Sequence, residues 1–131
     1  MNANSLRAIF LRKGEEGLYT KAKNIIPGYV LSDTISDKDI IVSYYKNDEE
    51  WLALTDSLLL FKNDFYMDLI KLKYTDIENV HPFPFGVDPN FTMSKSEDFI
   101  FLKTKTGNVY NLKVESGRPR NGILQLLHHA I

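Results

Sequence analysis

The sequence predicts a mainly β protein with helices, in which seven antiparallel strands form a small sandwich or barrel capped by a C-terminal helix. Three observations predict this class: short runs rich in β-branched and aromatic residues, turn residues between those runs, and an apolar stripe at helical spacing near the C-terminus. The 131 residues are enough for one domain. We expect residues 1–36 to form a helical extension and residues 37–131 the β domain, within a single compact unit.

Two short helices are predicted in the N-terminal segment. The first has apolar residues on one helical face, with Ser5 as a suitable cap. These residues are Leu6, Ile9 and Phe10. The second has a similar repeat, formed by Leu18, Ala22, Ile25 and Ile26. Pro27 and Gly28 are expected to end it, because proline cannot continue the hydrogen-bond ladder of a helix.

Seven strands are predicted in the next region. They are Ile40–Tyr45, Trp51–Thr55, Leu58–Lys62, Tyr66–Lys73, Glu78–Phe83, Phe99–Lys105 and Val109–Val114. Several turns between them are short and polar, as at Asn47–Glu49 and Asp56–Ser57, so neighbouring strands should be antiparallel. The longer connection from Pro84 to Asp98 is expected to be a flexible loop.

The C-terminal helix is predicted from position 119 onward. Pro119 suits the first helical position, where its missing N–H costs nothing. Apolar residues then form one stripe: Ile123, Leu126, Leu127, Ala130 and Ile131. Gly122 weakens the first turn by up to about 1 kcal/mol relative to alanine. Packing must therefore hold this helix, and it can plug the open end of a sandwich or barrel.

Three segments carry a resemblance to a known family. Glu50–Phe61 reads EWLALTDSLLLF, Tyr74–Val80 reads YTDIENV, and Phe99–Gly107 reads FIFLKTKTG before the last helix. They resemble a hairpin, a strand entry and a late strand of the bacterial PH-like and GRAM-like domains, which have the pleckstrin-homology fold. The resemblance covers about residues 40–131. Leu58 departs from it, because such hairpins often carry an arginine there.

The resemblance implies binding rather than catalysis, because PH-like domains commonly present loops and a groove to lipids or proteins. Members that hold phosphoinositides use basic residues around the first hairpin. In this chain Tyr45–Glu50 has three acids and one lysine, which would repel a phosphate headgroup. Recognition of inositol lipids by the usual route is not expected.

Composition excludes several other functions. A formal net charge of −1 makes a nucleic-acid partner unexpected. The absence of cysteine excludes disulfides, thiolate metal sites and cysteine nucleophiles. The sequence has no apolar run of the roughly 18 residues that cross a bilayer, and no signal-peptide pattern, so a cytoplasmic protein is expected.

Neither an enzyme nor a cofactor is expected. The chain lacks the G-x-S-x-G elbow and the glycine-rich phosphate loops. A small hydrolase would need His81, His128 or His129 beside a carboxylate or a serine. No metal site is expected either. The loosely spaced acids Asp33, Asp37 and Asp39 lack a calcium-loop pattern, and capping of a short turn by Ser36 or Asp37 explains part of them.

Two groups of residues are candidate binding sites. The first is Phe83, Phe85 and Val87, which are either partner anchors or aromatic and apolar residues folded onto the core. The second is an anionic-ligand patch of Lys71, Lys73, Lys103 and Lys105. Lysines on exposed strands also prevent sheet-to-sheet aggregation, which is the more common explanation.

The sequence therefore favours a binding or scaffold domain with a protein partner. The partner would contact the Phe83–Phe85 segment, or an exposed sheet edge by strand addition. A peripheral lipid or small-ligand module is the alternative, and a membrane partner is possible but less favoured. A small hydrolase is a third and weaker hypothesis. The sequence leaves the oligomeric state open.

Overall fold

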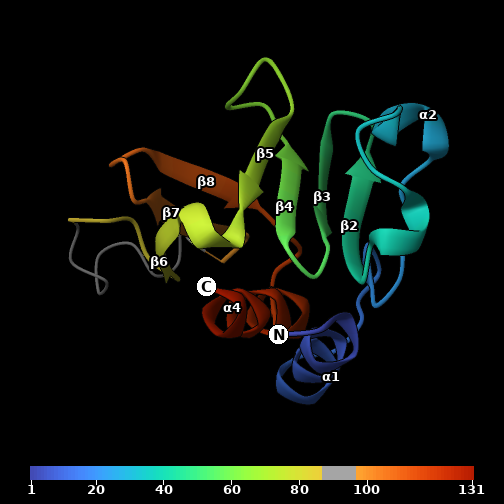
Figure 1. The fold of residues 1–131 in the computed structure, drawn as a ribbon, viewed down its shortest axis with the longest axis horizontal. Coiled ribbons are helices and arrows are strands. Elements are labelled where there is room, and N and C mark those ends of the chain that lie inside the picture. Colours follow the sequence, from blue (N-terminus) through green and yellow to red (C-terminus); the bar gives the residue numbers. More distant parts are fainter. Residues whose placement is uncertain (87–96) are drawn as a thin grey trace.

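The computed structural model describes residues 1–86 and 97–131, which form two antiparallel sheets and flanking helices (Figure 1). The first sheet has five strands in chain order: β1 (Thr20–Lys21), β2 (Val42–Asn47), β3 (Glu50–Leu54), β4 (Leu58–Lys62) and β5 (Ile70–Lys73). The second has three: β6 (Ile77–His81), β7 (Phe99–Thr104) and β8 (Val109–Lys113). The mixed β and α class is confirmed, but the two sheets do not close into a barrel.

The predicted runs become strands, but several of them have other bounds than expected. The run Tyr66–Lys73 enters the sheet only at Ile70, because Tyr66 lies in the connection and its hydroxyl accepts a hydrogen bond from β8. The run Glu78–Phe83 ends at His81, where Pro82 removes a backbone donor. The predicted loop Pro84–Asp98 falls mostly outside the described residues, because residues 87–96 are not among them.

The second predicted helix is wrong. Thr20 and Lys21 form the short strand β1, which pairs with Tyr44 and Ser43 of β2. Pro27 does not end a helix but precedes the one-turn helix α2 (Gly28–Leu31). The physical reason is that a distant carboxylate, described below, binds backbone N–H groups just before β1.

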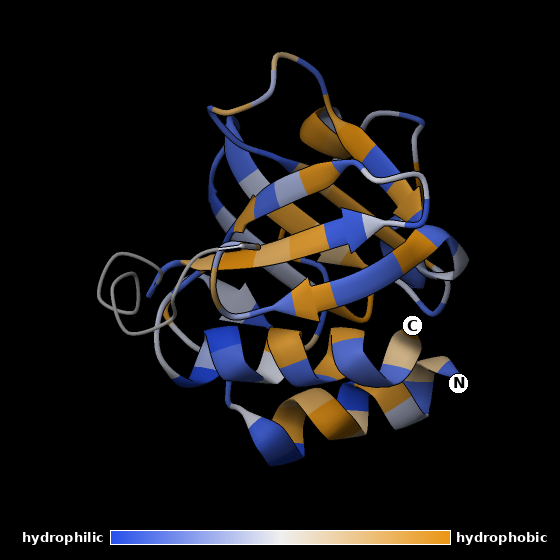
Figure 2. Ribbon diagram, turned by 90° about the vertical axis from the view of Figure 1, so that its left-hand side faces the viewer, coloured by the Kyte–Doolittle hydropathy of each residue, from blue (hydrophilic) through white to orange (hydrophobic). Residues whose placement is uncertain are grey.

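The main core lies between the two sheets and the helix α4 (Arg118–Ala130), as the apolar stripe predicted. Helix α1 (Ala3–Lys13) packs on the far side of α4, so α4 lies between α1 and the sheets (Figure 2). The side chain of Asn2, rather than Ser5, caps α1. Within the two described ranges, no helix is long and apolar enough to span a bilayer.

A second apolar cluster covers the outer face of the first sheet. Trp51, Ala53 and Leu60 point away from the main core and are buried beneath an irregular segment. That segment, residues 24–41, contains α2 and the 3₁₀ turn η1 (Asp37–Asp39). It contributes Ile26, Leu31 and Ile40 to the cluster. We call it the cover segment.

The connection between β4 and β5 covers the middle of the free edge of β8, at Asn111. The Asn63 side-chain amide donates to the Asn111 carbonyl at 3.0 Å, and the Asn111 N–H donates to the Tyr66 hydroxyl at 2.9 Å. The Tyr66 ring packs against Phe61 and Tyr110. The two sheets are therefore joined along this side by side chains as well as by the core.

Candidate functional site

The Phe–Pro segment is fastened to the start of α4. The Arg120 guanidinium donates to the carbonyls of Pro82 and Phe99, both at 2.7 Å. Phe83 and Phe85 are half-buried. The third predicted anchor, Val87, lies outside the described residues. The two phenylalanines therefore belong in part to the packing of the domain.

An aromatic row runs across the outer face of the second sheet, and we define it by Phe85, His81, Phe101, Phe99 and Phe65. Ring centroids of Phe85 and His81 lie 4.3 Å apart, those of Phe99 and Phe101 6.0 Å, and those of Phe99 and Phe65 5.6 Å. His81 and Phe101 are directly opposite each other in the β6–β7 pair. The row joins the Phe–Pro segment to the β4–β5 connection.

The exposed end of this row is an apolar tip that the sequence reading missed. Phe65 is 55% exposed and Met67 94% exposed, both in the β4–β5 connection. Met67 lies within the predicted strand Tyr66–Lys73, and Phe65 lies just before it. The signal that marks them is local: Asp64 and Asp68 flank them, and acids beside apolar residues are typical of a solvated loop.

The first lysine pair lies on β5, at the edge of the first sheet. Lys73 is opposite Leu58 and Lys71 is opposite Leu60. Leu72 between them packs against the main core. Because side chains alternate along a strand, both lysines point away from that core.

The second pair belongs to the other sheet. Lys103 follows Leu102, which is fully buried in the core, so Lys103 points outward from β7. Lys105 comes after the strand, and its backbone N–H donates to the Asp76 carbonyl. The two lysine pairs thus belong to different sheets. An anionic-ligand patch that contains all four lysines stays a prediction.

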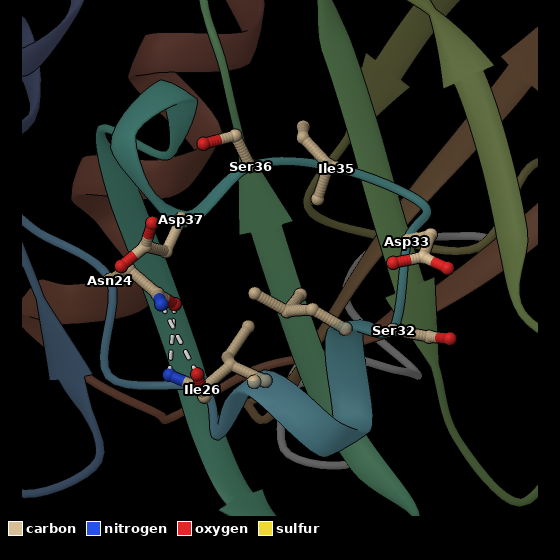
Figure 3. Close-up of a pocket in the computed structure, with 9 residues that line it drawn as sticks. Asn24, Ile26, Ser32, Asp33, Ile35, Ser36 and Asp37 are labelled. Carbon is tan, nitrogen blue, oxygen red and sulfur yellow. Dashed lines mark hydrogen bonds between the residues drawn. The ribbon is translucent and has the colours of Figure 1, made fainter.

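A polar hollow of about 470 Å³ lies within the cover segment, whose own residues line it (Figure 3). Asn24 frames it, and its side chain both accepts from and donates to the Ile26 backbone. Asp33 and Asp37 also line the hollow. In residues 1–86 and 97–131 no group of three or more histidine and acidic side chains is placed to hold a metal ion. Ser36 caps η1 by accepting from the Lys38 N–H.

An apolar hollow of about 460 Å³ lies where four parts of the chain meet. It is surrounded by the β3–β4 turn, by the end of β5 with the 3₁₀ turn η2 (Tyr74–Asp76), by Met1 ahead of α1, and by the end of α4. Its lining residues are Met1, Asp56, Ser57, Leu58, Lys73, Tyr74, Thr75 and Ala130. One lysine of the predicted anionic patch, Lys73, is therefore beside a concave surface.

Titratable groups near this end of the fold have shifted pKa values. Burial raises the pKa of the Tyr74 hydroxyl above its ordinary value, and that hydroxyl donates to the Thr55 carbonyl at 2.6 Å. Burial lowers the pKa of His128, with further lowering from the charges of His81 and His129. The Tyr74 hydroxyl therefore stays protonated and bonded to the Thr55 carbonyl inside the fold. The lowered pKa favours the neutral form of His128.

A comparison of the chain with protein-family models, curated proteins and solved structures finds no match. The resemblance to PH-like domains therefore stays a prediction, which rests on the three sequence segments.

Proposed function

We propose that the chain is a cytoplasmic, non-enzymatic PH-like binding domain that holds a protein partner at the apolar tip, Phe65 and Met67. The observation that carries this proposal is the exposure of these two side chains, 55% and 94%, at the end of an ordered aromatic row. A five-stranded sheet, a three-stranded sheet and a last helix support the PH-like part of the proposal.

The tip has the properties of a protein-binding anchor. The Phe65 ring contacts Phe99 edge-on at 5.6 Å and Tyr66 at 6.3 Å, so it loses little conformational freedom when a partner binds. Met67 is long and flexible, which lets it fit an irregular apolar surface. Aromatic residues held in place by neighbours are typical centres of protein interfaces.

The charges beside the tip favour a protein over an anionic membrane. Asp64 and Asp68 flank the two apolar side chains and are exposed. Carboxylates repel the anionic headgroups that attract peripheral membrane proteins. They suit the polar rim of a protein interface instead.

Site-specific photo-cross-linking tests the proposal. A photoreactive amino acid is placed at Met67 in the living source cell, and in a matched strain at Leu18, which is 77% exposed and outside the tip. We expect one discrete protein adduct from position 67 and none of that size from position 18.

A substitution adds specificity to the test. Phe65→Ser should abolish the adduct at position 67 while the far-UV circular dichroism spectrum stays unchanged, because Phe65 is half-exposed. The same adducts from positions 67 and 18, or an adduct that survives Phe65→Ser, would remove the tip as the binding site.

A further inference from the structure

We propose that the apolar hollow beside Lys73 binds an amphipathic monocarboxylate, a molecule with one carboxylate on an apolar chain or ring. This site is separate from the apolar tip: the tip lies in the β4–β5 connection, whereas the hollow lies at the opposite end of β5. It shares no residue with the proposed protein-binding surface.

The walls of the hollow suit an apolar tail. Leu58 and Ala130 present aliphatic groups, and Met1 adds a flexible apolar side chain. Tyr74 also lines the hollow, and its hydroxyl is already bonded to the Thr55 carbonyl inside the fold. A volume of about 460 Å³ is within the range of small-ligand sites, which combine mostly apolar walls with a few polar groups.

The polar groups at the rim favour an anionic head. Lys73 supplies an ammonium group, and Ser57 and Thr75 supply hydroxyl donors. Within the described residues Lys73 takes part in none of the ion pairs, which involve Lys62, Lys113 and Arg118. A lysine stem can lie along an apolar wall with its ammonium group at the rim, where it can meet a carboxylate.

One rim group opposes this assignment. Asp56 can only accept hydrogen bonds when ionised, and it would repel a carboxylate. Its side chain is short and belongs to the β3–β4 turn, whereas the longer Lys73 side chain can follow a ligand head. The Ser57 and Thr75 hydroxyls can donate to a carboxylate or accept from a cation, so the preference for an anion depends on the longer reach of Lys73, and Asp56 is a useful test position.

Titration of the ¹⁵N-labelled full chain with decanoate, followed by amide chemical shifts, tests the site. We expect saturable shifts at Ser57, Leu58, Thr75 and Ala130, the amides that surround the hollow. Lys73→Met keeps the apolar stem and removes the charge, and it should weaken binding at least about tenfold. The control is Lys71→Met on the same strand and face, which does not line the hollow and should bind as the parent does.

Two further arms separate carboxylate recognition from general apolar binding. Decylamine should bind more weakly than decanoate, and Asp56→Asn should strengthen decanoate binding by removing a like charge. Equal binding of the amine and the acid, equal effects of Lys73→Met and Lys71→Met, or shifts absent from the hollow would each overturn the proposal. None of these results bears on cross-linking at the apolar tip.

Discussion

At Glu115, a single carboxylate accepts three hydrogen bonds from a segment 95–97 residues earlier in the chain. The donors are the N–H groups of Leu18 and Tyr19, at 2.8 and 2.9 Å, and the Thr20 hydroxyl, at 2.7 Å. A β-carbon at Gly17 would clash with this carboxylate, so a larger residue there would have to displace the Glu115 side chain from its partners. Glu115 therefore fastens the start of β1 to the segment that follows β8.

Glu115→Gln is expected to lower the free energy of unfolding by about 1–3 kcal/mol, because a charged acceptor of backbone N–H groups becomes a neutral one. Chemical denaturation measures the loss. Glu16→Gln is the control: Glu16 lies in the same segment but accepts one described bond, from the Ala22 N–H. A smaller loss for Glu115→Gln than for Glu16→Gln would contradict this role.

The same contacts explain why the second predicted helix is wrong. The repeat of apolar residues fits a helix locally and would place Leu18 on its buried face. In the structure Leu18 is 77% exposed. The N–H groups of Leu18 and Tyr19 bind a carboxylate that local sequence cannot place beside them. Tertiary hydrogen bonds override weak local propensity in this way.

At the scale of elements, α1 and α4 approach each other through two glycines. A β-carbon at Gly122 would lie 2.8 Å from the Phe10 ring and 2.9 Å from the Phe10 carbonyl oxygen. A β-carbon at Gly14 would lie 2.5 Å from the Gly122 α-carbon. The Asn121 side chain also donates to the Lys13 carbonyl, at the end of α1. The two helices are therefore closely docked.

Gly122→Ala is expected to destabilise the protein by about 1–3 kcal/mol, because overpacking α1 outweighs the gain in helix propensity. Thermal unfolding gives the comparison. Gly28→Ala is the control, because its added methyl group would meet nothing within 4 Å in the short helix α2. Stabilisation by both substitutions would show that α1 does not need the close approach.

The last helix shows what a local pattern can and cannot predict. Its stripe was predicted correctly, and Ile123, Leu126 and Leu127 are fully buried. Gly122 was interpreted only as a weak position within its own helix. The effect of Gly122 on stability depends on its contact with Phe10, which lies more than a hundred positions earlier. The spacing of residues within one helix carries no information on that contact.

At the scale of the whole molecule, the N-terminal segment contacts both the last helix and the first sheet. Helix α1 packs on α4, β1 pairs with β2, and the cover segment buries Trp51 on the first sheet. Contacts of this kind join residues 1–36, predicted as an extension, to residues 37–131. We expect the two parts to unfold together.

Denaturant unfolding followed by two signals tests this expectation. Trp51 is the only tryptophan and lies 2% exposed beneath the cover segment, so its fluorescence reports the N-terminal contacts. Far-UV circular dichroism reports all the helices and strands. Coincident midpoints are expected for one cooperative unit. A fluorescence transition at distinctly lower denaturant would make the segment a separable extension.

Strands were predictable and the candidate sites were not, for a physical reason. A strand is recognised from alternation and flanking turns, both of which are local. The hollow beside Lys73 is built by four distant parts of the chain, and the aromatic row by residues from Phe65 to Phe101. Lys73 and Phe85 are candidates from the sequence alone, whereas the surfaces that surround them depend on residues far away in the chain.

The covered edge of β8 has a consequence for synthesis on the ribosome. An uncovered strand edge is a template for pairing with other chains. The groups that bind this edge, from Asn63 and Tyr66, precede β8 in the sequence and therefore emerge first. The groups that cover this edge are thus already synthesised when β8 emerges. This order limits the time during which the edge of β8 can pair with other newly made chains.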